Sequence, residues 1–299
     1  MTRRHLLRAL PAVALASPPT PGIRLGGPIF LKSTDPVELA REHKRLGYGA
    51  AYCPTVPLAD AARVEKAFAA ENVILAEVGA WKNMLDPDPT VRAANLAYVQ
   101  ERLVLADAVG AKCCVDIAGS FNPKVWYGPH KDNLSPRFYD ATVENVRKVL
   151  DAVKPKRTKF ALEIMGWSAP DSATSYLKLI KAIDRPAFGV HIDVCNAVNS
   201  PSLFYNNATL TGDLFKRLGR WIVSCHAKDL AWLPEMNVHY VEVIPGRGEI
   251  DYQAYLRAIH RYAPQAPLML EHLKTAEEYL EGATYIRKMA VIAQVPIFT

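Results

Sequence analysis

The sequence predicts a single α/β domain, a (β/α)8 TIM barrel, and three observations support this fold class. Short β-rich runs alternate eight times with longer segments of helical apolar spacing. Eight strand and helix pairs in about 270 residues favour a parallel sheet with right-handed crossovers that closes on itself. Of the 299 residues, 50% are hydrophobic and 22% charged, a composition that excludes a disordered or collagen-like chain.

The eight expected strands are runs rich in β-branched and other apolar residues that lie between turn formers. They cover residues 23–31, 49–53, 73–78, 112–117, 158–164, 187–193, 221–226 and 267–271. A doubly wound open sheet is the alternative architecture. No G-x-G-x-x-G sequence opens a helix after the first strand, which disfavours a dinucleotide-binding fold of that kind.

Capping residues predict where several helices begin and end, because Asp and Ser accept hydrogen bonds from free N–H groups and Gly ends a helix in left-handed backbone. We expect helices over 36–46 behind Asp35, over 90–109 before Gly110, over 136–153 behind Ser135, and over 275–290.

Two connections, 118–134 and 227–250, are too long for simple turns. Both follow strands, so they belong to the carboxyl-terminal face on which barrel enzymes carry their active sites.

The first 22 residues resemble a twin-arginine export leader. Arg3, Arg4 and Arg8 precede a short run of small apolar residues. A frayed basic terminus is the alternative, so periplasm and cytoplasm both stay open as locations. We assign residues 1–22 to this leader and 23–299 to the barrel. No apolar stretch reaches the roughly 18 residues that cross a bilayer.

Charge and cysteine content exclude several other classes. The 36 Lys and Arg exceed the 30 Asp and Glu by six, and the surplus forms no basic tract. We therefore expect a small-molecule partner rather than a nucleic acid, and a homo-oligomer stays open. The five cysteines form no C-x-x-C pair, which argues against a disulfide framework or a thiolate zinc site.

Side chains that commonly bind metals end the last four predicted strands. Glu163, Asp193, His226 and Glu271 each follow an apolar run. Strand ends meet at the mouth of a barrel, and three carboxylates gathered there repel one another unless a cation holds them. Oxygen ligands with one imidazole suit Mn²⁺ first, and also Mg²⁺, Co²⁺ or Zn²⁺. The sequence therefore predicts one divalent-metal site.

Three other polar residues lie near strand ends. We expect Glu77 and Asp116 to line the pocket or cap loops. His191 shares a strand face with Asp193, two residues on, and we expect it to support the ligands without binding the metal.

Residues of the connecting segments supply candidates for substrate binding and catalysis. Trp81 and Asn83 follow the third strand and offer an aromatic wall and an amide for a sugar. His130 offers a loop imidazole as acid or base and as a substrate contact. Lys228 either stabilises an oxyanion in catalysis or pairs with the adjacent Asp229, and Arg247, between two glycines, can reach a hydroxyl or phosphate.

The order of the four ligands and two motifs carry a resemblance to a known family. The motifs are His226-Ala227-Lys228-Asp229 and Pro245-Gly246-Arg247-Gly248-Glu249-Ile250-Asp251. Residues 23–290 look like the xylose-isomerase-like TIM barrels called the sugar phosphate isomerase/epimerase family. The resemblance implies that the four positions hold one divalent metal. It also implies that Glu163 and Glu271 exchange a substrate proton, as two glutamates do in the family's ketose 3-epimerases.

Two positions depart from the ketose 3-epimerase pattern. Asn196 stands three residues after the metal Asp, where those enzymes usually place a substrate-contacting His, and we assign it to substrate binding. Trp232 stands six residues after the metal His in place of their Arg. Both departures argue against a ketohexose epimerase of the usual kind.

These residues predict a divalent-metal-dependent isomerase or epimerase of a sugar or polyol, which removes a proton next to a carbonyl and forms an enediolate. The alternative is a lyase or dehydratase that eliminates a β-substituent from a keto-inositol or a keto-sugar such as a 3-keto-glycoside. A non-catalytic sugar-binding protein is less favoured. An apurinic endonuclease is disfavoured too, because its trinuclear zinc site needs histidines after early strands and Asp116-Ile117-Ala118 offers none.

Overall fold

The computed structural model describes residues 22–298. The predicted leader therefore lies outside the described residues except for Gly22, and it stays a prediction. Within residues 22–298, no helix combines the length and the apolar character that crossing a membrane requires.

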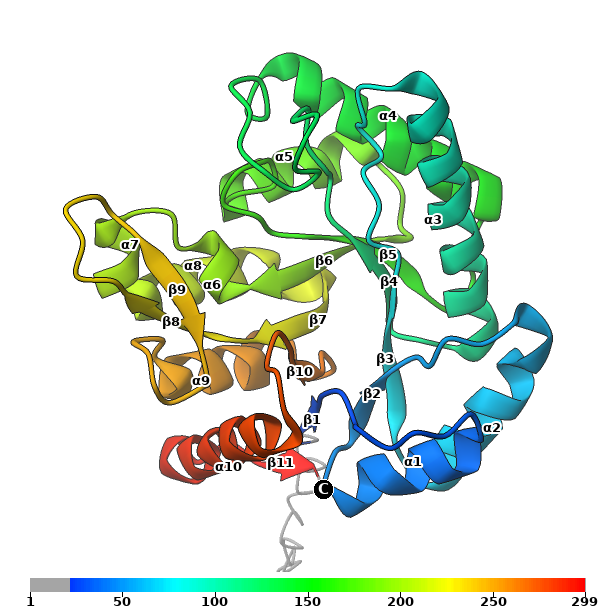
Figure 1. The fold of residues 1–299 in the computed structure, drawn as a ribbon, viewed down its shortest axis with the longest axis vertical. Helices are drawn as coiled ribbons and strands as arrows, with labels where there is room; N and C mark the ends of the chain where they lie inside the picture. Colours follow the sequence, from blue (N-terminus) through cyan, green and yellow to red (C-terminus); the bar gives the residue numbers. More distant parts are fainter. Residues whose placement is uncertain (1–21, 299) are drawn as a thin grey trace, which may run out of the picture.

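Eight parallel strands form a closed ring, with the helices around its outside (Figure 1). In chain order they are β1 (Ile23–Gly26), β2 (Ala50–Tyr52), β3 (Ile74–Gly79), β4 (Cys113–Asp116), β5 (Lys159–Glu163), β6 (Phe188–Asp193), β7 (Ile222–Ala227) and β10 (Leu268–Leu270). The ring closes where β1 pairs with β10, with Leu25 opposite Leu268. The predicted (β/α)8 barrel is confirmed, and the open sheet was the wrong alternative. A short strand, β11 (Ile297–Phe298), pairs with β1.

The outer helices begin and end close to their predicted caps. They are α1 (Pro36–Arg45), α2 (Ala61–Ala70), α3 (Pro89–Val109), α4 (Pro136–Val153), α5 (Ala173–Ile183), α8 (Asn207–Leu218), α9 (Tyr252–Tyr262) and α10 (Ala276–Ala293), with 3₁₀ turns at Leu58–Asp60 and Gly219–Trp221. Two short helices, α6 (Val194–Ala197) and α7 (Pro201–Tyr205), lie in the connection after β6. Asp35 and Ser135 accept from backbone N–H groups as N-caps, and Gly110 takes left-handed backbone (φ 68) after α3.

Two segments differ from the sequence prediction. The first strand stops at Gly26 and does not continue to residue 31, because Gly27-Pro28 follows and proline cannot donate to a ladder. Residues 227–250 contain an antiparallel hairpin, β8 (Asp229–Trp232) and β9 (Tyr240–Val243). The hairpin stands on the carboxyl-terminal side of the barrel, next to α7 (Figure 1).

Small and apolar side chains fill the interior of the barrel. Buried clusters there include Ala50, Ala76 and Met269 in one group, and Cys113, Val115 and Ala161 in another. All five cysteines are free, and all but Cys53 are buried. Buried polar side chains of β3, β6 and β7, namely Glu77, His191 and Ser224, interrupt this apolar filling.

Candidate metal centre

The four predicted ligands converge at the mouth of the barrel. Glu163, Asp193, His226 and Glu271 each offer one ligand atom, and these atoms all lie within 4.8 Å of one another. Nδ1 of His226 lies 2.9 Å from Oε1 of Glu163, 2.8 Å from Oε1 of Glu271 and 3.8 Å from Oδ2 of Asp193. Successive strands of the ring thus bring together residues that are far apart in the sequence.

The donor set fits a divalent cation. Oδ2 of Asp193 and Oε1 of Glu271 are buried and accept no hydrogen bond. Each lies within ion-pair distance of the Lys228 ammonium, but neither contact has hydrogen-bond geometry. Buried carboxylate oxygens with unused lone pairs are costly unless a cation takes them. Three carboxylates and one imidazole are ligands that Mn²⁺, Mg²⁺, Co²⁺ and Zn²⁺ all accept.

Lys228 lies among these carboxylates and does not pair with Asp229. Its Nζ is 2.9 Å from Oδ2 of Asp193 and 2.6 Å from Oε1 of Glu271. Burial lowers the pKa of Lys228, but Asp193, Glu163 and Glu271 outweigh burial and raise this pKa well above its ordinary value. The predicted alternative of an ion pair with Asp229 is wrong. Asp229 instead accepts backbone N–H groups from residues 230, 246, 248 and 250 and fixes that loop.

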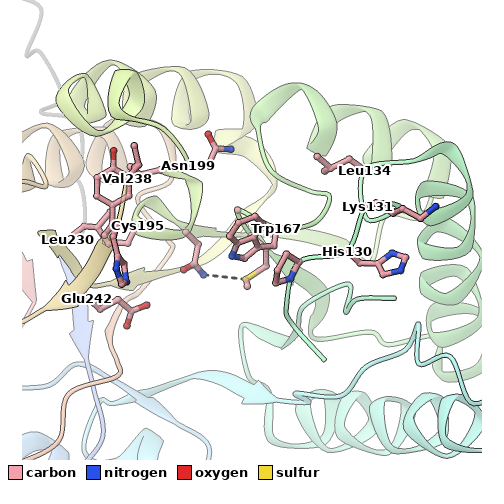
Figure 2. A pocket seen from close by; sticks show the side chains of 16 residues that line it. His130, Lys131, Leu134, Trp167, Cys195, Asn199, Leu230, Val238 and Glu242 are labelled. Atoms are coloured by element: carbon pink, nitrogen blue, oxygen red, sulfur yellow. Dashed lines mark hydrogen bonds between the residues drawn. The ribbon is translucent and has the colours of Figure 1, made fainter. Parts of the chain in front are cut away.

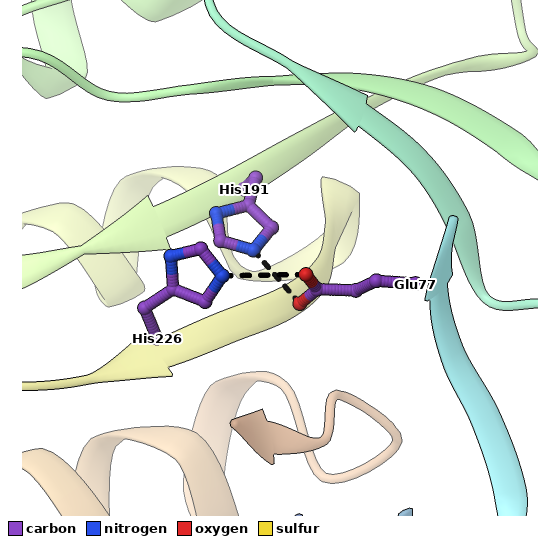
Figure 3. A group of neighbouring side chains, drawn as sticks. All are labelled: Glu77, His191 and His226. Carbon is purple, nitrogen blue, oxygen red and sulfur yellow. Dashed lines mark hydrogen bonds and ion pairs between the residues drawn. The ribbon is translucent and has the colours of Figure 1, made fainter. Parts of the chain in front are cut away.

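The second nitrogen of His226 faces Glu77, which extends from β3 (Figure 3). Nε2 of His226 lies 3.2 Å from one Glu77 oxygen, and Nε2 of His191 lies 3.0 Å from the other. Ser224 also donates its hydroxyl to Glu77. If Nε2 donates to Glu77, Nδ1 is left for a metal, so this contact is compatible with a cation bound at Nδ1.

The electrostatics of this layer follow from the same contacts. Burial raises the pKa of Glu77, but His191 and His226 outweigh it and hold this pKa well below its ordinary value. Burial lowers the pKa of His226, but Glu271, Glu163 and Glu77 together raise it well above its ordinary value. His191 contacts Glu77, and its role as a support for the ligands stays a prediction. Glu77 neither lines the pocket nor caps a loop, which corrects that prediction.

Trp81 and Asn83, both after β3, differ in exposure: Trp81 is exposed and Asn83 is buried. The Trp81 ring is 6.4 Å from the His226 ring between centroids and is 39% exposed, so it lies beside the four predicted ligands. Asn83 is buried, and its side chain accepts from the N–H groups of Leu85 and Ser120 and donates to the Ser120 carbonyl. These bonds use the amide, so the structure corrects the prediction that Asn83 contacts a sugar. Asp116 caps the adjacent loop as expected, accepting from the N–H of Lys82.

Asn196 connects two of the ligands. Its Nδ2 donates to Oε1 of Glu163 at 2.9 Å, and its backbone N–H donates to Oδ1 of Asp193 at 3.0 Å. It also lines a cleft of about 1090 Å³ beside the centre. The predicted substrate-binding residue is thus in place to hold Glu163 as well.

His130 and Arg247 lie farther out. His130 lines the same cleft, and its Nδ1 lies 3.2 Å from the backbone N–H of Asp132. Arg247 is exposed and makes two contacts of 2.7 and 2.8 Å with Glu281. It borders a smaller cavity of about 220 Å³ that Lys228 and Glu271 also line.

Two polar residues of the site were absent from the sequence prediction. Glu242, on β9, lies 3.3 Å from Nζ of Lys228, and His272 lies 2.8 Å from the other Glu242 oxygen. His272 directly follows Glu271 and has left-handed backbone (φ 60), an uncommon conformation that turns the chain away at the strand end. The β-forming run Tyr240-Val241-Glu242-Val243 was the available signal for a strand here, but it does not indicate the contact of Glu242 with Lys228.

Comparisons with known proteins agree with this architecture. A family model described as xylose isomerase-like TIM barrel matches residues 37–289. A probable L-ribulose-5-phosphate 3-epimerase of Mycoplasma pneumoniae is 28% identical over 177 residues, which are 59% of this chain and 52% of that protein. The match therefore spans about half the length of that curated relative.

Solved structures show the same fold at low sequence identity. The 3-keto-D-glucoside 4-epimerase of E. coli is 15% identical with a TM-score of 0.64, over 89% of this chain and 99% of that one. A xylose isomerase-like TIM barrel protein from Mycobacterium smegmatis, in complex with magnesium, is 15% identical with a TM-score of 0.61, over 91% of this chain and 97% of that one. At these identities the likeness establishes the barrel and its closure.

Proposed function

Because the chain belongs to the xylose isomerase-like TIM barrel family, we propose that it is a divalent-metal-dependent isomerase or epimerase of a sugar or polyol. The observation that carries this proposal is the placement of two glutamates against one metal-binding imidazole. Glu163 and Glu271 lie 2.9 and 2.8 Å from Nδ1 of His226 and come from β5 and the end of β10. The sugar epimerases among the similar proteins support the same class of reaction.

The cation would be held by Glu163, Asp193, His226 and Glu271. A divalent ion at this position polarises a substrate carbonyl and acidifies the neighbouring C–H group. We propose Mn²⁺ first, with Mg²⁺, Co²⁺ and Zn²⁺ as alternatives, because all accept oxygen-rich ligand sets.

The two glutamates divide the proton transfer between them. One carboxylate takes the proton from the carbon next to the carbonyl, and the other returns a proton. Return to the opposite face of the same carbon gives epimerisation, whereas return to the neighbouring carbon gives aldose–ketose isomerisation. Lys228 adds a buried positive charge that stabilises the enediolate oxygen, and Trp81 excludes water on one side.

Solvent exchange tests this function. Protein loaded with Mn²⁺ is incubated in D2O with D-fructose, L-ribulose, L-ribulose 5-phosphate and methyl 3-keto-β-D-glucoside, and the sugars are analysed by mass spectrometry and NMR. We expect deuterium next to the carbonyl of at least one sugar, lost on chelation and in Glu163→Gln and Glu271→Gln. Absence of exchange into every sugar by fully loaded protein would contradict the proposal and favour a non-catalytic sugar-binding protein.

A second candidate is a lyase or dehydratase, and His130 is the observation that favours it. Its Nδ1 faces a backbone N–H, so Nε2 carries the proton of the neutral ring and can donate it to a leaving group in the cleft. An elimination needs only one glutamate for deprotonation. Release of water or an aglycone, with a kcat about 10² to 10⁴ lower in His130→Asn, would identify this reaction. For an epimerase, the same variant should mainly alter KM.

A further inference from the structure

The cleft beside the metal centre is larger than the proposed reaction on one sugar ring requires. Its volume is about 1090 Å³. Clefts of about 300–1,000 Å³ already bury drug-sized ligands, so a single ring would leave much of this space unfilled. The cleft lies between the loops after β4 and β5 on one side and the β8–β9 hairpin on the other (Figure 2).

The inner end of the cleft borders the metal centre. Asn196 lines the cleft and donates to the Glu163 carboxylate, while Glu242 lines it and lies 3.3 Å from Nζ of Lys228. A ligand that fills the cleft therefore reaches the reacting groups at this end. Figure 2 shows His130 across the cleft from Glu242, with Trp167 between them.

Trp167 supplies an aromatic face on a fixed backbone. Trp167 lines the cleft and is 61% exposed, so its indole ring is accessible to a ligand there. Its carbonyl accepts from Nδ2 of Asn133 at 3.1 Å. The fully buried Asn133 also bonds Ser120, Gly128 and Phe121, which ties the loop after β4 to the loop after β5.

The opposite wall is anchored as well. Tyr240 of the hairpin stacks on Phe204 of α7 with ring centroids 4.8 Å apart and 8° between the planes. Because these walls are already fixed, they lose little conformational entropy when a ligand binds, which favours the binding of a rigid ligand such as a ring.

The charges along the cleft disfavour a phosphate group. No arginine is among the described residues that line it, and Glu242 presents a carboxylate at its inner end. Arginine is the side chain that most often binds phosphate in two-pronged geometry. The single lysine, Lys131, lies at the far side in an exposed position.

We propose that this cleft binds the second ring of an uncharged glycoside, either a second sugar or an aryl group, whose first ring occupies the metal centre. The inference rests on the proposed function and specifies its substrate class. Trp167 stacks on the second ring, and the first ring lies between Asn196 and Glu242.

Calorimetric titration of Mn²⁺-loaded protein tests this inference. The probes are cellobiose, maltose, trehalose and 4-nitrophenyl β-D-glucoside, compared with D-glucose, methyl β-D-glucoside and L-ribulose 5-phosphate. At least one two-ring probe should bind at least tenfold more tightly than glucose, the size of effect expected for one well-anchored aromatic contact, about 1.4 kcal/mol. Trp167→Ala should remove that gain, and Trp167→Phe should retain most of it.

Trp232→Ala is the matched control, because Trp232 is 53% exposed on the hairpin but does not line the cleft. The inference is overturned if two-ring probes bind no tighter than glucose, or if Trp167→Ala and Trp232→Ala behave alike. Tighter binding of L-ribulose 5-phosphate than of every glycoside would also overturn it and assign the cleft to a phosphorylated sugar. Deuterium exchange is evaluated separately from binding. If the protein exchanges deuterium into a sugar but binds two-ring probes no more tightly than glucose, only this inference fails. If two-ring probes bind more tightly in a Trp167-dependent way but no sugar exchanges deuterium, only the proposed reaction fails.

Discussion

The metal centre and the adjacent cleft are built in different ways. The ligands of the centre are at or next to the ends of barrel strands, where the ring of backbone hydrogen bonds fixes their positions. The cleft is made by loops and a hairpin, and it is held by side-chain contacts such as those of Asn133 and Tyr240. Chemistry that needs accurate geometry lies on the rigid part, and recognition of a particular ligand lies on the part that varies most easily. Changes in one region should therefore leave the other largely intact.

Replacing the two glutamates should produce the largest difference between an effect on turnover and an effect on ligand affinity. Glu163→Gln and Glu271→Gln should each lower kcat by about 10² to 10⁴, because each removes a group that exchanges a proton. The gain in affinity of a two-ring probe over glucose should change far less, since neither side chain lines the large cleft that holds the second ring. Rates of solvent exchange and calorimetry check the two halves of this expectation. Equal loss of exchange and of binding would mean that the two regions are not separable.

Glu77 should affect the metal centre alone. Glu77→Gln keeps the shape of the side chain but weakens its hold on the His226 and His191 rings. We expect the dissociation constant for Mn²⁺ to rise about 10- to 100-fold, as is typical when a partner of a ligating histidine is changed. Metal competition titration measures it, with Arg247→Ala as a surface control. An unchanged metal affinity would show that Glu77 is a packing residue only.

Asn133 should affect the cleft alone. Asn133→Ala removes the side chain that joins the two loops and leaves the partly buried N–H of Phe121 without its acceptor. The free energy of unfolding should fall by about 1–3 kcal/mol. Thermal or denaturant unfolding measures this loss, and sugar binding should weaken while the Mn²⁺ affinity stays at the wild-type value. A parallel loss of metal binding would contradict the independence of the two regions.

The pH dependence of metal affinity should come from the centre and not from the cleft. The carboxylates raise the pKa of His226 well above its ordinary value, which favours the protonated imidazole in the metal-free site. A metal at Nδ1 must displace that proton. Below this raised pKa, the affinity for Mn²⁺ should therefore increase with pH, by up to about tenfold per unit for one released proton. Titrations at pH 6, 7 and 8 check the sign, and a flat profile would contradict it.

The contrast between strand ends and loops also explains which features could be predicted from the sequence. The barrel followed from the alternation of apolar runs, and the four ligands followed from their places at strand ends, because ring closure alone brings strand ends together. Glu242 was missed because its strand pairs only with β8, inside a segment interpreted as a loop. Asn83 was misassigned because its partner Ser120 lies 37 residues away, across a loop whose path the sequence does not reveal. Contacts between loops depend on long-range packing that local patterns do not encode.

Metal stoichiometry in His226→Ala tests the central claim most directly. His226 is the ligand that every carboxylate of the centre faces, at 2.8, 2.9 and 3.8 Å from its Nδ1. Elemental analysis after loading with Mn²⁺ and gel filtration should give one ion per wild-type chain and much less than one per variant chain, with metal-dependent thermal stabilisation lost. His260→Ala, on α9, should bind metal like the wild type. Full stoichiometry in His226→Ala would contradict the assignment of this site.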